Sequence, residues 1–132
     1  MLGSTVHDVI DFTNASFVKL NAWDLGEARL AVSDLLLAGE EVLHAFKGIR
    51  DSVTFTDRRL IALNVQGLTG KKKDYTSLPY SRVQAFSVET AGTLDLDSEL
   101  QLWFSGLGAV KLDFGRGVDI REIGRLIGER IL

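Results

Sequence analysis

Residues 94–104 read LDLDSELQLWF and place an apolar side chain at every second position except Ser98. Successive side chains of a β-strand point to opposite faces, so this alternation predicts a strand with one buried face. Comparable alternating runs, separated by turn residues, fill residues 42–114, and we count about seven of them. The pattern is typical of a small antiparallel β-barrel or sandwich and predicts a mainly β (α+β) protein.

An amphipathic segment closes the chain. Asp119 can cap a helix at its start. The apolar residues that follow fall on one helical stripe, namely Ile120, Ile123, Leu126, Ile127 and Ile131. Gly124 and Gly128 leave part of this helix without side chains, which allows either tight packing on the sheet or a helix contact between subunits.

The N-terminal third is also predicted to be helical. Asp24 resembles an N-cap with Glu27 three residues later, and apolar residues follow with helical spacing as far as Leu36. Gly39 stands just past the end, where helices commonly need a left-handed residue. An earlier helix is predicted over residues 6–18, and this segment could also be an arm that docks only in an oligomer.

The composition sets limits on the function. The chain has 132 residues, a net charge of −3, 45% hydrophobic residues and no cysteine. Its length favours one domain, which we divide into an N-terminal helical segment, residues 1–38, and a strand-rich domain, residues 39–132. The absence of cysteine excludes disulfides and thiolate metal sites, and the negative charge argues against nucleic-acid binding. No apolar run reaches ~18 residues and the N-terminus lacks the basic region of a signal peptide, so a cytoplasmic protein is expected.

Lys71, Lys72 and Lys73 form the only basic run of the sequence. Clustered cations attract phosphate groups, so the run could contact an anionic ligand or a membrane headgroup. The alternative is a solvated edge strand, where lysines discourage pairing with other sheets. Both interpretations stay open on the sequence alone.

Acidic side chains share one face of the predicted strand that opens this section: Asp95, Asp97 and Glu99. Carboxylates are ligands for Ca²⁺, but residues two apart on a strand diverge from an ion unless a loop folds round it. A solvated or salt-bridged face is therefore favoured, with a contact to basic residues of a neighbouring subunit as the alternative. Trp103 has the same parity and is predicted to lie on the outer face, either marking an interface or partly covered by the N-terminal helix.

Four charged residues flank one predicted hairpin: Arg50, Asp51, Arg58 and Arg59. They predict either a structural ion-pair network or a patch that binds a partner. His7 and His44 lie far apart in the sequence and belong to no cluster with metal-ligand spacing. No nucleophile elbow or glycine-rich phosphate loop is present, so we expect no catalytic residue and no metal or other cofactor.

Six short strings stand in order between residues 39 and 105: GIRD (48–51), FTDRRLI (55–61), QGLTGKK (66–72), SLPY (77–80), FSVETAG (86–92) and DLDSEL (95–100). Together they resemble the bacterial pleckstrin homology (PH)-like domain family. The resemblance implies a PH-like seven-stranded antiparallel barrel or sandwich with a C-terminal capping helix. It also implies a cyclic homo-oligomer, best associated with a five-fold ring, without an established enzymatic activity or a settled ligand.

The leading functional hypothesis is therefore a binding and assembly module whose partner is a second copy of itself, with a further protein partner unknown. The second hypothesis is peripheral binding to an anionic lipid or ligand through Lys71, Lys72 and Lys73. PH domains that bind phosphoinositides place several basic residues in the loop between the first two strands, whereas residues 48–51 hold one arginine beside an acid. A third hypothesis is an enzyme that uses Asp95, Asp97 and Glu99 at a subunit interface.

Overall fold

The computed structural model describes residues 15–66, 72–92 and 97–132. In chain order the elements are β1 (Ala15–Ala22), α1 (Leu25–Val32), β2 (Val42–Lys47), β3 (Asp51–Thr56), β4 (Arg59–Gln66), β5 (Lys72–Pro79), the short 3-10 helix η2 (Tyr80–Arg82), β6 (Val83–Glu89), β7 (Ser98–Phe104), β8 (Gly108–Phe114) and α2 (Ile120–Ile131). The predicted mainly β fold with a C-terminal helix is confirmed, and β2–β8 are the seven strands expected within residues 42–114.

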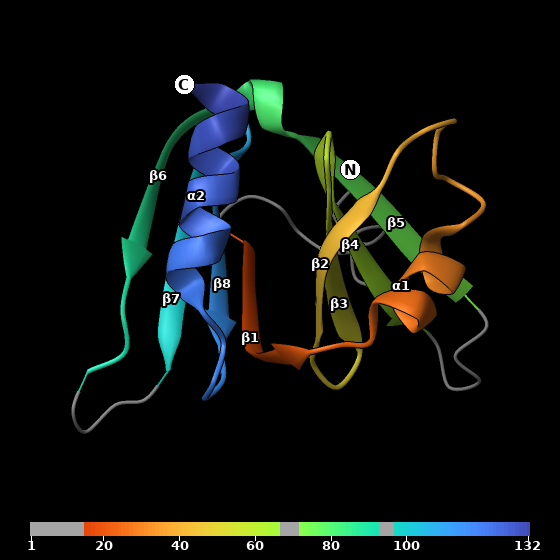
Figure 1. The fold of residues 1–132 in the computed structure, drawn as a ribbon, viewed down its shortest axis with the longest axis horizontal. Coiled ribbons are helices and arrows are strands. Elements are labelled where there is room, and N and C mark those ends of the chain that lie inside the picture. Colours follow the sequence, from red (N-terminus) through yellow and green to blue (C-terminus); the bar gives the residue numbers. More distant parts are fainter. Residues whose placement is uncertain (1–14, 67–71, 93–96) are drawn as a thin grey trace, which may run out of the picture.

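The strands form one sheet in the order β5-β4-β3-β2-β1-β8-β7-β6. Neighbouring strands are antiparallel except β1 and β8, which run parallel. The sheet is folded so that β2–β5 lie on one side and β6–β8 on the other, with β1 between them and α2 beside β6 and β7 (Figure 1). The predicted edge position of the lysine-bearing strand is confirmed, because β5 ends the sheet.

Both halves of the sheet share one apolar core. Phe46 stands at its centre and meets the rings of Phe55 and Phe114 edge-on, with ring centroids 6.0 and 4.8 Å apart. The stripe predicted on the last helix reaches the same core, because Ile123 and Ile127 are fully buried there. The apolar phase of each strand therefore points inward, as the alternation predicts.

The outer face of the β2–β5 half is covered by α1. Val32 at the end of this helix packs in a second apolar cluster with Val42 of β2 and Ile61 of β4. As a result, residues 60–63 of β4 are all buried, whichever face they occupy. The sequence signal for this arrangement is the continuous apolar run at residues 60–63, which is typical of a strand covered on both faces.

The prediction of helix over residues 6–18 is wrong where the structure describes it, since residues 15–22 form β1; residues 1–14 lie outside the described ranges. Phe17 and Leu20 are both buried although they are three apart, which is helical spacing. A bulge at Lys19, which has a φ of 55°, brings both side chains to the same face of a strand. Because of the extra residue, two buried positions of this strand are three residues apart, as buried positions of a helix often are.

The helix α1 is shorter than predicted. Asp24 caps it as expected, accepting a hydrogen bond from the Glu27 backbone N–H at 3.0 Å. The helix ends at Val32 rather than near Leu36, because the following backbone is held by side chains from the sheet. For example, Arg59 donates to the Leu35 carbonyl at 2.6 Å. Within residues 15–66, 72–92 and 97–132, neither α1 nor α2 has the length and apolar run needed to cross a bilayer.

The packing of α2 answers one question left by the sequence. A Cβ added to Gly124 would lie 2.9 Å from Val88 Cγ2, so this glycine lets the helix approach β6 of its own chain.

Asp119 caps the helix by accepting from the Arg121 backbone N–H at 3.1 Å. The β6–β7 register shifts between Val83 and Ala85, which marks a bulge in β6. Because of this bulge, Val83 and Phe86 both contact the core although they are three residues apart.

Candidate functional site

The outer face of β6, β7 and β8 is the first candidate surface. Register places Ala85, Trp103 and Ala109 side by side across the three strands, and we call these residues the tryptophan row. The Trp103 side chain is 37% exposed, which confirms its predicted outer position. In the described part of the chain, α1 contacts β2 and α2 packs into the core, so the indole faces solvent. An exposed aromatic side chain on an open sheet face is typical of an interface.

An acidic row lies on the same face, four residues away from the tryptophan row along each strand, and consists of Glu89, Glu99 and Asp113. Lys111 Nζ lies 3.2 Å from Glu99 Oε2, and this hydrogen bond raises the pKa of the lysine. Removal from water is the main cause that raises the pKa of the Asp113 carboxyl, and a hydrogen bond that its protonated form donates to Glu99 is the second. These acids therefore stand close enough to disfavour one another's charge.

Of the acidic residues predicted from the sequence, Glu99 takes part in the Lys111 ion pair and Asp97 is exposed just before β7. Asp95 lies outside the described residues. The described His, Asp and Glu side chains form no group of three that could hold a metal ion. For the described residues Asp97 and Glu99, a solvated or salt-bridged strand face is therefore a better description than a metal site.

The turn between β2 and β3 forms a second candidate surface at one end of the sheet. A hollow of about 200 Å³ beside it is lined by basic side chains from three elements or turns: Lys47, Arg50 and Lys73. A second hollow, of about 400 Å³, lies between this turn and β1, and Lys47 and Ile49 line both hollows. Ile49 itself is 100% exposed. The structure thus brings Arg50 and Lys73 together, as the sequence did not predict.

Polar contacts shape this end of the molecule. Lys47 Nζ lies 5.5 Å from the centroid of the Trp23 ring, within the range of a cation–π contact. Removal from water raises the pKa of the Asp51 carboxyl, and the Arg50 charge opposes that shift. Lys72 is exposed at the start of β5, and Lys71 lies outside the described residues. The predicted lysine run is therefore described only for Lys72 and Lys73.

The four hairpin residues do not form one cluster. Arg50 and Asp51 stand at the start of β3, and Arg58 and Arg59 follow its last residue, Thr56. Residues 52–57 separate Asp51 from Arg58, which corresponds to roughly 20 Å of extended backbone. One network spanning all four residues is therefore excluded by the strand between them.

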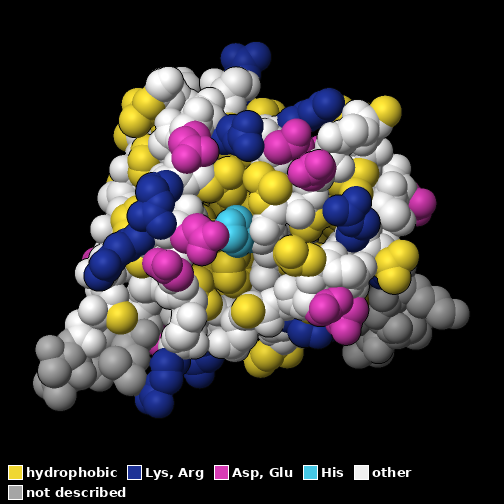
Figure 2. Space-filling model, in the orientation of Figure 1, with side chains coloured by type: hydrophobic (Ala, Val, Ile, Leu, Met, Phe, Trp, Pro, Cys, Tyr) yellow, Lys and Arg dark blue, Asp and Glu magenta, His cyan; other side chains and the backbone are white. Residues whose placement is uncertain are grey.

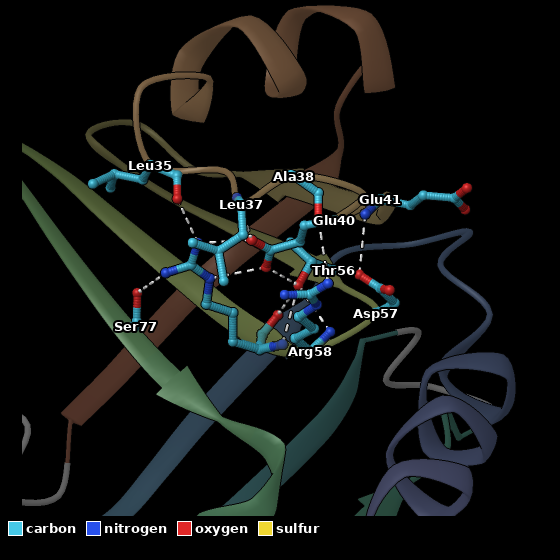
Figure 3. Close-up of polar contacts among 10 residues, drawn as sticks. Leu35, Leu37, Ala38, Glu40, Glu41, Thr56, Asp57, Arg58 and Ser77 are labelled. Carbon is cyan, nitrogen blue, oxygen red and sulfur yellow. Dashed lines mark hydrogen bonds and ion pairs between the residues drawn. The ribbon is translucent and has the colours of Figure 1, made fainter.

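Arg59 instead belongs to a buried polar network with Glu40, shown in Figure 3. Arg59 Nη2 and Nε donate to Glu40 Oε1 and Oε2 at 2.8 and 2.9 Å, and the Thr56 hydroxyl donates to Oε2 at 2.6 Å. The Glu40 side chain is fully buried. The hydrogen bonds from Arg59 lower the pKa of the Glu40 carboxyl to about 2. These hydrogen bonds hold residues 35–41 against the sheet.

The neighbouring Arg58 has a similar structural role, because its Nη2 lies 3.4 Å from the Ala38 carbonyl oxygen. Sequence reasoning identified both arginines but missed Glu40, the partner of Arg59. The sequence feature that could have indicated Glu40 is its place directly after Gly39, between a predicted helix and a predicted strand. This place does not show that Glu40 binds Arg59, which lies 19 residues further along the chain.

A groove between β2 and α2 has a volume of about 330 Å³ and is lined by Leu43, His44, Glu122, Arg125, Leu126, Glu129 and Arg130. Figure 2 shows this face hollowed near its centre, with apolar side chains inside and charged side chains around it. His44 Nε2 lies 3.7 Å from Glu122 Oε1, and the His44 side chain is 27% exposed. His44 therefore lies partly buried in β2, and His7 lies outside the described residues.

Comparison with known proteins identifies relatives along nearly the whole chain. A family model described as "Bacterial PH domain" matches residues 11–131. Over 98 residues the chain is 48% identical to the uncharacterized protein YjqA of Bacillus subtilis (strain 168), a match that spans 73% of this chain and 78% of YjqA. A protein with a pleckstrin-homology domain from Shewanella loihica PV-4 superposes with a TM-score of 0.75 at 36% identity, over 87% of this chain and 99% of that chain. A pleckstrin homology domain from Shewanella amazonensis SB2B superposes with a TM-score of 0.63 at 42% identity, over 83% of this chain and 90% of that chain.

These matches agree with the fold. The family model spans all the described strands and both helices, so it includes β1, which the sequence prediction missed. The seven strands β2–β8 followed by α2 have the order that the resemblance implies. The chain therefore belongs to the bacterial PH domain family.

Proposed function

We propose that this protein is a non-enzymatic binding and assembly module whose copies join into a closed homo-oligomeric ring. The observation that carries the proposal is the open outer face of β6–β8, where the tryptophan row presents an exposed indole. A pentamer is the size expected from the family resemblance. Membership of the bacterial PH domain family supports binding rather than catalysis, because PH-like domains are not usually enzymes.

A ring supplies function through geometry. Each copy carries the same weak binding surface, and the ring holds all of them at fixed separations. A multivalent partner then meets the second surface at a high effective concentration, so its overall affinity exceeds that of one site without any new contact. The unknown partner is therefore expected to be multivalent itself.

Native mass spectrometry, with light scattering in solution, tests the assembly. We expect one closed species whose mass is a whole multiple of the 14.5 kDa chain, with five copies as the expected number. A monomer across the micromolar range would refute the proposal. A series of open oligomers that grows with concentration would refute closure, because a ring has a fixed copy number.

A second candidate function is peripheral binding to an anionic membrane surface through the β2–β3 end. The supporting observation is a fully exposed Ile49 beside the basic side chains of Lys47 and Lys73. An apolar side chain next to cations suits the boundary between headgroups and acyl chains. Each cation near an anionic leaflet contributes about 1 kcal/mol, so the expected affinity is low and salt-sensitive.

Flotation with vesicles of phosphatidylcholine, with and without phosphatidylserine, tests this candidate. Binding is expected only to the anionic vesicles at low salt, and the Ile49→Asp variant should lose it. Leu132→Asp is the matched control, because Leu132 is 97% exposed and follows α2 rather than lying in the β2–β3 turn. Equal recovery of wild type and Ile49→Asp with the vesicles would refute the candidate.

A further inference from the structure

The first half of β2 has an open edge. The strand β1 pairs with β2 only at Phe46 and Lys47, and the Trp23 N–H then donates to the Ala45 carbonyl at 3.0 Å. Past that bond the chain enters α1, so among the described residues 42–44 pair with β3 alone. An open strand edge presents backbone N–H and C=O groups to an extended chain that lies beside it.

The groove between β2 and α2 lies at this edge. Leu43 and His44 line it from the strand, and α2 lines it from Glu122 to Arg130. The helix packs closely on η2, β6 and β7, which leaves the space on its β2 side. From Glu122 to Arg130 the helix rises ~12 Å, and an extended segment of four residues spans ~13 Å. The groove therefore has the length of about four extended residues.

A bulge turns two neighbouring side chains of β2 into the groove. The β2–β3 register shifts between Val42 and His44, so Leu43 is the extra residue. Leu43 packs against the apolar core, and the His44 ring stacks on Phe46 with centroids 6.5 Å apart. Neighbours in a regular strand point to opposite faces, whereas both of these residues line the groove. Bulges at sheet edges often redirect a side chain in this way beside a functional site.

The chemistry of the lining favours an uncharged, extended ligand. Leu43 and Leu126 supply apolar contacts inside the hollow, and charged side chains surround it (Figure 2). The charged residues that α2 contributes are two acids and two bases: Glu122, Glu129, Arg125 and Arg130. A polyanion would meet both carboxylates and a polycation would meet both guanidinium groups, and like charges brought together cost affinity. A peptide backbone with apolar side chains avoids both costs.

We propose that this groove binds an extended peptide segment of a partner protein, which adds to β2 as a further strand beside residues 42–45 and is covered on its other side by α2. Hydrogen bonds from the open edge hold the peptide backbone, and an apolar side chain contacts Leu43 and Leu126. This inference rests on the proposed binding function and names the surface that each copy of the ring presents. The groove lies within one copy, so binding of a single peptide does not require the ring.

A library of random dodecapeptides displayed on phage supplies the probes. Peptides selected on the immobilised protein should carry apolar residues at alternate positions, because alternate side chains of an added strand face the same way. Fluorescence polarisation with the synthetic peptides measures their affinity. A library that yields no binder, or only highly charged peptides without this alternation, would overturn the proposal.

Labelled cysteines place the peptide in the groove. The chain contains no cysteine, so a single introduced thiol can carry a bulky maleimide. Arg125→Cys puts the label in the groove, and Arg121→Cys is the matched control, an exposed arginine of the same helix that does not line it. The label at residue 125 should weaken peptide binding by about tenfold or more, and the label at residue 121 should leave it unchanged. Equal affinities of the two labelled proteins would overturn the proposal.

Hydrogen exchange of the wild type, followed by NMR, locates the peptide without any substitution. The amides of residues 42–45 that point away from β3 should exchange rapidly in the free protein and slowly in the complex. Slow exchange in the free protein would overturn the proposal, because the edge would then already be covered. Protection confined to β5 or β6, the strands at the two ends of the sheet, would overturn it as well.

Native mass spectrometry of the same protein separates this inference from the proposed ring. A monomer that binds the selected peptides in the groove would refute the ring and support the peptide site. A closed ring that binds none of them would support the assembly and overturn the peptide site.

Discussion

Glu40→Gln is the most informative perturbation of the buried network. The side chain is fully buried and both of its oxygens accept hydrogen bonds from Arg59, whose side chain is 16% exposed. Glutamine keeps the shape of Glu40 but removes its charge, and it replaces one accepting oxygen with an NH2 group that cannot accept from Arg59. The guanidinium of Arg59 is then left in a largely buried position without a counter-charge.

The pKa of Glu40 sets the size of the effect. Its fall from the ordinary value of 4.5 to about 2 means that the folded protein prefers the ionised form, which corresponds to about 3 kcal/mol. Removing one partner of a buried ion pair costs about 3–5 kcal/mol, in the same range. We therefore expect Glu40→Gln to lower the free energy of unfolding by about 3 kcal/mol at neutral pH.

The effect depends on pH with a definite sign. Because the folded-state pKa is depressed, the stabilisation is fully present above about pH 4.5 and is lost as the pH falls toward 2. Urea denaturation of wild type and variant should therefore give a stability difference that shrinks by about 2 kcal/mol between pH 6 and pH 3. Glu41→Gln is the matched control, since Glu41 is exposed next to Glu40 in the sequence, and it should stay within about 0.5 kcal/mol of wild type. A difference that is equal at both pH values would refute the argument.

Two further pairs of variants test the packing by thermal or urea denaturation. Gly128→Ala should stabilise α2 by up to ~1 kcal/mol, because its new Cβ would lie 3.7 Å from the nearest ring atom. Gly124→Ala should gain less or destabilise, because its Cβ would lie 2.9 Å from Val88; equal gains at both sites would contradict the packing. Thr54→Val should stabilise by about 1 kcal/mol, since the buried Thr54 hydroxyl has no partner among the described residues. Thr56→Val should destabilise by a similar or larger amount, since its hydroxyl bonds Glu40; a stabilised Thr56→Val variant would be the contrary result.

Much of the fold could be predicted because the spacing of apolar residues and the positions of turn residues specify the strands and the last helix locally. The strands β2–β8 and the helix α2 lie where the alternation and the capping residues place them. The error at β1 has a specific cause, since one bulged residue changes a strand's apolar spacing from two to three. The bulge lies within the parallel pairing with β8, a contact between chain segments about 95 residues apart that no local pattern encodes.

The candidate surfaces were less predictable, because they depend on which distant residues meet. The outer position of Trp103 follows from parity within one strand and is confirmed. The placement of Arg50 and Lys73 around one hollow, and the ion pair of Arg59 with Glu40, depend instead on how the β2–β5 half is paired and on where residues 35–41 return to it. Charge alone could not assign Glu40 to Arg59, since several acids lie near this arginine in the sequence.

The pattern of apolar residues that predicts the fold also distinguishes the two halves of the sheet, because it shows which strands are covered on both faces and which have an exposed outer face. Residues 60–63 of β4 are apolar without interruption, and this strand is covered on one face by the core and on the other by α1. By contrast, β7 alternates strictly, so its outer phase is polar everywhere except at Trp103. A large apolar side chain in an otherwise polar phase contributes nothing to its own core. An exposed indole on such a face is typical of an interface, and this is the observation behind the proposed assembly.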